Sequence, residues 1–172
     1  GFTSDRQDNM VETPHGHDEH HLVPVYSLYS ETRTPTTEML NGIDLMVIDL
    51  PDIGTRVYTY ASTMANCLRA CREHGIPVIV TDRPNPIGGV TVEGPMLESG
   101  WTSFVGQFPI PLRHGLTMGE LAELFNSEFG VGAELEIVPM TGWNRAMYFD
   151  NTGLPWVMPS PNLPTLESLI VY

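Results

Sequence analysis

Positively charged side chains are scarce in this sequence. Its 172 residues include eight Lys and Arg against 21 Asp and Glu, which gives a formal net charge of -13. Nucleic acids and anionic membrane surfaces attract positive patches, so this acidic excess disfavours both as partners. The hydrophobic fraction of 41% is that of a folded domain with a core. We therefore expect a globular protein with another kind of ligand.

Cysteine is also scarce, and its placement argues against disulfide or thiol chemistry. Cys67 and Cys71 lie four residues apart in a predicted helix. Two cysteines on one helix face do not form a disulfide scaffold. Neither lies at a helix N-terminus, where a thiol would be activated as a nucleophile. We expect both to be buried and reduced.

Several signatures of other protein classes are missing. No apolar run approaches the ~20 residues of a transmembrane helix, and no signal-peptide pattern is visible. The sequence has no P-loop, no G-x-G-x-x-G and no G-x-S-x-G elbow, which disfavours a nucleotide-dependent α/β enzyme and predicts no cofactor. The chain starts without Met and ends in the apolar run 169–172, so we expect both ends to lie inside domains.

What the sequence does contain is an alternation of strand and helix patterns. We expect strands at 23–29, 43–50, 78–81 and 133–138, and helices at 36–40, 59–74 and 117–129. Gly75 is a helix stop, and Thr117 with Glu120 forms a capping box. The run 43–50 is nearly all apolar, as in a parallel strand covered on both faces. The strand–helix–strand order predicts an α/β fold with a parallel sheet and flanking helices.

Polar residues follow two of these strands directly. Asp82, Arg83 and Asn85 follow strand 78–81 in a loop stiffened by two prolines. Strand 43–50 leads into a second polar cluster that contains Asp52 and Arg56. Ligands of open parallel sheets bind at the carboxyl ends of the strands, so we expect both clusters to line one cleft. The alternative is a rigid connector in which Asp82 and Arg83 pair with each other.

Two further residues are candidates for the same cleft. Glu93 lies between apolar neighbours, and such surroundings favour a protonated carboxyl that can act as a general acid. The alternative is an exposed glutamate on a strand edge. His114 follows an aromatic and proline-rich stretch that suits a sugar or another ring-bearing ligand. It is a candidate for catalysis, for ligand contact, or for a structural role.

The segment 15–21 contains four histidines and two carboxylates. Such composition suggests a metal, but the spacing H-E-x-x-H is absent and no helix or strand is predicted to support a site. We predict a solvated loop that binds no metal.

Five motifs occur together in one order and carry a family resemblance. They are Asp49–Tyr60, Asp82–Pro86, Val92–Pro95, Pro109–Gly115 and Pro159–Asn162. Together they resemble the exo-β-N-acetylmuramidase family of peptidoglycan recycling, over residues 22–172. The resemblance implies a Rossmann-like domain followed by a smaller C-terminal domain, with the active cleft between them. We accordingly expect a partial Rossmann-like domain at 1–138 and the start of a truncated C-terminal domain at 139–172.

The resemblance also implies that parts of the active site lie outside this chain. The family's Ser-Pro-Glu-His-Gly motif would end at Gly1, so its glutamate, a candidate catalytic carboxylate, and the first strands of the Rossmann-like domain would be missing. The family's substrates are peptidoglycan glycans, from whose non-reducing ends it releases N-acetylmuramic acid. That substrate favours a periplasmic or secreted protein over a cytoplasmic one.

Candidate roles follow from the resemblance and from the chemistry of glycoside hydrolysis, which usually requires two carboxylates. The catalytic candidates are Glu93, Asp82 and His114. Arginines are candidates for pairing with the lactyl carboxylate of muramic acid, and aromatic rings for packing on the sugar. The predicted substrate-binding residues are Asp52, Arg56, Tyr58, Tyr60, Arg83, Asn85, Arg113 and Asn162. The alternative function is a non-catalytic cell-wall glycan-binding module on the same scaffold.

Overall fold

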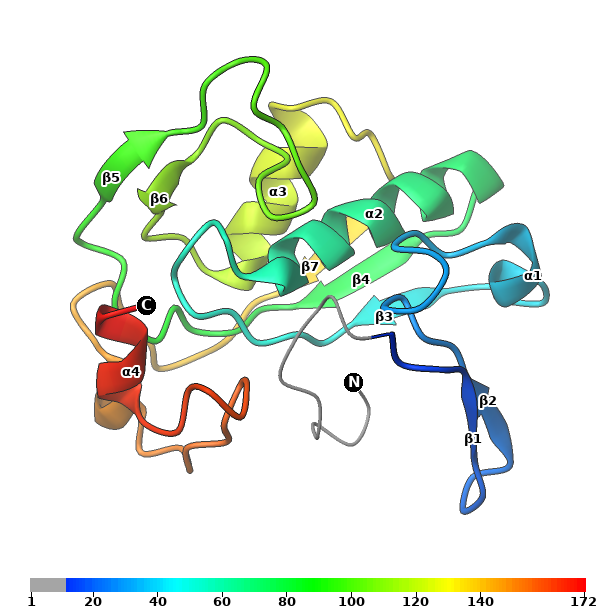
Figure 1. Ribbon diagram of the computed structural model, residues 1–172, viewed down its shortest axis with the longest axis horizontal. Helices are drawn as coiled ribbons and strands as arrows, with labels where there is room; N and C mark the ends of the chain where they lie inside the picture. The colour runs from blue at the N-terminus through cyan, green and yellow to red at the C-terminus, as the bar shows by residue number, and fades with distance from the viewer. Residues whose placement is uncertain (1–11) are drawn as a thin grey trace.

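A three-stranded parallel sheet forms the centre of the computed structural model, which describes residues 12–172 (Figure 1). Its strands are β3 (Met46–Ile48), β4 (Val78–Thr81) and β7 (Leu135–Val138), in the order β3-β4-β7. The register places Ile48, Val80 and Ile137 side by side. The predicted α/β class with a parallel sheet is confirmed. β3 is shorter than the strand expected at 43–50.

Two helices cover one face of this sheet (Figure 1). They are α2 (Thr59–His74) and α3 (Met118–Ser127). Met64 and Leu121 from the helices pack with Val80 in the main core, fully buried. The predicted bounds of α2 are confirmed, and Gly75 ends the helix in the left-handed region at φ 66°. The predicted capping box of Thr117 and Glu120 is also confirmed at the start of α3.

The opposite face of the sheet is largely open among the described residues. Val47 of β3 is 56% exposed and Val138 of β7 is 44% exposed. The expectation that strand 43–50 is covered on both faces is therefore wrong for the part of the chain described. Within that part, the helices are too short or too polar to cross a membrane.

Smaller elements surround the sheet. Strands β1 (Gly16–Asp18) and β2 (Val23–Val25) form an antiparallel hairpin, and α1 (Thr37–Leu40) follows. The histidine segment 15–21 thus lies in a hairpin rather than in an irregular loop, and the strand expected at 23–29 ends at Val25. A second antiparallel pair, β5 (Glu93–Met96) and β6 (Pro111–Arg113), lies beside α3 in Figure 1.

The segment 139–172 folds back onto the strand ends. It contains the 3-10 helix η1 (Phe149–Thr152) and helix α4 (Leu166–Ile170). Its residues Leu163 and Leu169 join Ile53, Tyr58 and Ile87 in a second buried cluster. This cluster connects the loops after β3 and β4 to α4. The domain boundary at 138/139 remains a prediction.

Candidate active site

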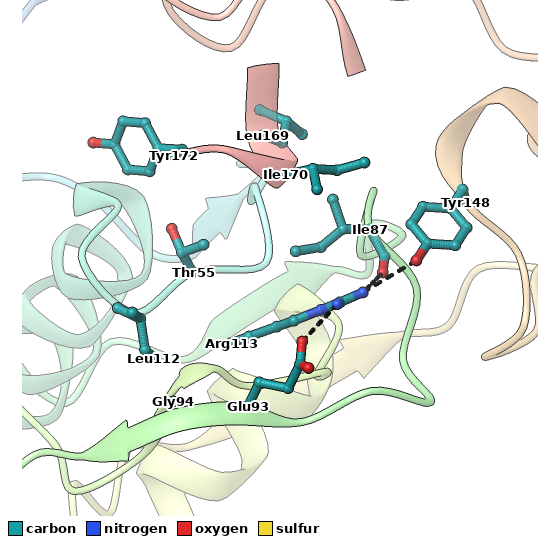
Figure 2. A pocket seen from close by; sticks show the side chains of 10 residues that line it. All are labelled: Thr55, Ile87, Glu93, Gly94, Leu112, Arg113, Tyr148, Leu169, Ile170 and Tyr172. Carbon is teal, nitrogen blue, oxygen red and sulfur yellow. Dashed lines mark hydrogen bonds and ion pairs between the residues drawn. The ribbon is translucent and has the colours of Figure 1, made fainter. Parts of the chain in front are cut away.

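A pocket of about 300 Å³ opens between the β5–β6 hairpin and the C-terminal helix α4 (Figure 2). A volume of this size is at the lower end for small-molecule sites. Its walls come from six separate stretches of the chain. The lining residues are Thr55, Ile87, Glu93, Gly94, Leu112, Arg113, Tyr148, Leu169, Ile170 and Tyr172.

Arg113 is the cation of this pocket. Its Nη1 donates to Glu93 Oε2 at 3.0 Å, and its Nη2 donates to the Ile87 carbonyl at 2.6 Å and to Tyr148 Oη at 3.3 Å (Figure 2). Burial by itself lowers the pKa of Arg113, but the contacts with Tyr148 and Glu93 outweigh it and the net shift is upward. The guanidinium is therefore charged and held in place from three sides.

Glu93 faces Arg113 because the two residues pair across the β5–β6 ladder. The side chain of Glu93 is 64% exposed, and all of β5 is exposed. The apolar surroundings expected from its sequence neighbours are absent, because Val92 and Met96 also face solvent. The exposed strand-edge alternative describes Glu93 correctly, and its carboxylate lies at the pocket wall.

The loop after β3 is hydrogen-bonded to β6, and this builds the pocket wall. Thr55 forms a bridge with Arg113, and the Arg56 amide donates to the Leu112 carbonyl at 2.8 Å. The Arg56 guanidinium donates to the carbonyls of Pro95 and Ile110. Arg56 therefore holds the β5–β6 hairpin in place and does not line the pocket.

Asp52 and His114 form a buried pair behind this wall. Their side chains are each 1% exposed, and His114 Nε2 lies 3.1 Å from Asp52 Oδ2 without the geometry of a directed hydrogen bond. Asp52 Oδ2 accepts the Gly54 amide at 2.7 Å, and His114 Nδ1 accepts the Leu116 amide at 3.1 Å. Since Nδ1 accepts, the proton of a neutral His114 is on Nε2. The pair packs the loop that carries Thr55 against the end of β6, beside Arg113.

The polar residues after β4 have structural contacts outside the pocket. Asp82 Oδ1 accepts the Gly119 amide at 2.7 Å, at the start of α3, where a carboxylate is favourable. Arg83 forms a bidentate pair with Asp49, at 2.7 Å for both bonds. The alternative in which Asp82 pairs with Arg83 is thus also wrong.

Asn85 and Tyr58 are likewise engaged in the interior. Asn85 is fully buried; it donates to the Leu116 carbonyl at 2.9 Å and accepts the Ile87 amide at 3.1 Å. Tyr58 donates to the Pro159 carbonyl at 2.7 Å, and burial raises its pKa far above the usual range. Its ring packs against that of Tyr60, at 4.8 Å between centroids. Asn162 lies in a turn in which its backbone amide donates to Ser160 Oγ.

Of the eleven residues predicted for the site, two line the pocket, Glu93 and Arg113. The sequence predicts one cleft that also contains Asp52, Arg83 and His114. None of these three residues lines the pocket. Sequence reasoning missed Thr55 and Tyr148. Thr55 lies within the motif Asp49–Tyr60, but Tyr148 carried no signal, because it comes from a segment assigned to another domain.

Metal ligands are not gathered at any point of residues 12–172: no group of three or more His, Cys, Asp or Glu side chains is arranged to hold an ion. In the hairpin, His21 Nδ1 lies 2.6 Å from Asp18 Oδ2, and His15 Nδ1 accepts the Ser27 amide at 3.0 Å. The absence of a metal site in 15–21 remains a prediction.

Together, the parallel sheet, the hairpin and the pocket define an α/β protein with a small pocket that holds one paired carboxylate and guanidinium. A family model described as "Exo-beta-N-acetylmuramidase NamZ, N-terminal" matches residues 1–167. The chain belongs to this family, which confirms the resemblance noted from the five motifs.

Individual relatives agree with this assignment. The chain is 57% identical over 155 residues to the peptidoglycan beta-N-acetylmuramidase NamZ of Bacillus subtilis (strain 168), which covers 90% of this chain and 37% of the relative. Two crystal structures of DUF1343 family proteins from Bacteroides fragilis NCTC 9343 share the fold. One has a TM-score of 0.86 at 47% identity, covering 90% of this chain and 41% of its own. The other has a TM-score of 0.80 at 32% identity, covering 91% and 42%. The chain thus spans about two fifths of these relatives.

Proposed function

We propose that this chain is the substrate-binding part of a glycoside hydrolase that releases N-acetylmuramic acid from the non-reducing ends of peptidoglycan glycans. The observation that carries the proposal is the pairing of Glu93 with Arg113 in the pocket, within a chain that belongs to the muramidase family. A muramic acid residue carries a lactyl carboxylate, which requires a cation. Hydrolysis of the glycosidic bond usually requires a carboxylate as acid, base or nucleophile.

Arg113 is the best-placed of the three arginines considered for the lactyl group. Arg56 is committed to two backbone carbonyls, and Arg83 is committed to Asp49. Arg113 lines the pocket, and its planar guanidinium matches a carboxylate. Glu93, on the facing strand, is the catalytic candidate that reaches the same space.

The second carboxylate of the usual mechanism is absent from the pocket's lining. Asp82 is occupied at the start of α3, and Asp52 is buried beside His114. A two-carboxylate mechanism therefore draws its partner from outside the residues described, as the family resemblance implies. A single carboxylate also suits the alternative of a non-catalytic glycan-binding module.

Kinetics on a chromogenic N-acetylmuramic acid glycoside separates the two functions. The complete gene product should hydrolyse it, and Glu93→Gln should lower kcat by about 100-fold or more with a smaller change in KM. The exposed Glu98→Gln is a matched control that should leave both constants unchanged. Binding of muramic acid without any turnover would support the module, and a fully active Glu93→Gln would remove Glu93 from the mechanism.

A further inference from the structure

The two partners of the Glu93–Arg113 pair are held with very different firmness. Arg113 is 20% exposed in its side chain and is fixed by the Ile87 carbonyl and Tyr148 Oη. Glu93 is 64% exposed, and among the described residues the bond from Arg113 is the one its carboxylate accepts. The Arg113 guanidinium is thus a fixed part of the pocket, whereas the exposed Glu93 carboxylate is held, within residues 12–172, only by its bond to Arg113.

This difference decides what an entering anion does. Moving Arg113 would strand the Ile87 carbonyl, whose bond of 2.6 Å is the shortest that the guanidinium makes. Moving Glu93 costs little, because an exposed ion pair contributes at most about a fivefold factor to an equilibrium constant.

We propose that a ligand carboxylate binds Arg113 by displacing Glu93, and that this exchange frees the Glu93 carboxylate to act inside the pocket. The inference rests on the proposed function, which supplies the carboxylate as the lactyl group of the sugar. An anionic sugar exchanges with Glu93, whereas a neutral amino sugar of the same ring leaves Glu93 paired with Arg113. The exchange therefore links recognition of the acidic substituent to the state of the candidate catalytic carboxylate.

The exchange makes an unusual prediction for affinity, because removing the charge of Glu93 removes a competitor. The test is a ligand-observed NMR titration of the complete gene product with N-acetylmuramic acid and with its neutral methyl ester. We expect the acid to bind the unmodified protein about tenfold more tightly than the ester. Glu93→Gln should tighten binding of the acid about two- to fivefold and leave the ester unchanged.

Two further variants test whether Arg113 is the residue that binds the ligand carboxylate. Arg113→Lys keeps the charge but loses the fork that bonds Ile87, and it should remove most of the difference between acid and ester. Tyr148→Phe removes one hydroxyl contact to Arg113 and should change the ratio by less than about twofold. Should Arg113→Lys fail to fold, Glu93→Gln still decides, because Glu93 is an exposed side chain outside the core.

Equal binding of acid and ester, or binding of the acid that is unchanged or weaker in Glu93→Gln, would overturn the exchange. These outcomes are distinct from failure of the proposed function. A protein that hydrolyses the muramic acid glycoside but binds acid and ester equally refutes the exchange alone. A protein that shows the expected affinities but has no hydrolase activity refutes the hydrolase and retains the exchange.

Discussion

Gly54 is the residue whose substitution should most directly disturb both the fold and the pocket. It has φ +86°, and a Cβ placed there would lie 2.4 Å from Ile87 Cγ1 and 2.7 Å from Asn85 Oδ1. Both neighbours are buried and have little room to move. For Gly54→Ala we expect about 1–2 kcal/mol of backbone strain and a further ~1–3 kcal/mol from overpacking. The total loss of unfolding free energy should be about 2–5 kcal/mol.

Gly42 is a matched control for the backbone term. It has φ +78°, but nothing lies within 4 Å of the position that a Cβ would take, so Gly42→Ala should cost about 1–2 kcal/mol. Urea unfolding of both variants of the complete gene product, followed by circular dichroism, measures the difference. Because Gly54 precedes Thr55 in the pocket wall, Gly54→Ala should also weaken binding of N-acetylmuramic acid. Equal destabilisation by the two variants would refute the packing argument.

Three further predictions concern other parts of the chain. Asp82→Ala should lower the free energy of unfolding by about 1 kcal/mol, because the Gly119 amide loses its acceptor. Asp82→Asn keeps an acceptor oxygen and should retain most of that stability. Loss of turnover in Asp82→Asn at unchanged stability would instead support a catalytic role for Asp82. Burial raises the pKa of Cys67 to about 12 and also raises that of Cys71, so a disulfide reagent at about pH 8 should label both thiols only after denaturation. The 172-residue chain alone should have little or no muramidase activity beside the complete gene product, and equal activity of the two would contradict the need for a second carboxylate.

Local signals in the sequence determined the class of fold and several element boundaries. Helix α2 has its predicted bounds, and its end at Gly75 follows from the left-handed backbone that glycine tolerates. The capping box of α3 and strand β4 were likewise predicted, because each depends on residues that are close together in the sequence. The five motifs, read together, identified the family.

The tertiary structure alone decided which polar residues face the pocket. Asp82, Arg83 and Asn85 follow a strand, as many site residues do, but their partners are a helix amide, Asp49 and a distant carbonyl. Glu93 and Arg113 meet because a hairpin pairs them across 20 residues, and Tyr148 reaches them from 35 residues beyond Arg113. A motif shows that polar groups occur together in the chain. Long-range pairing and burial determine which of them remain free to meet a ligand, and no local pattern records either.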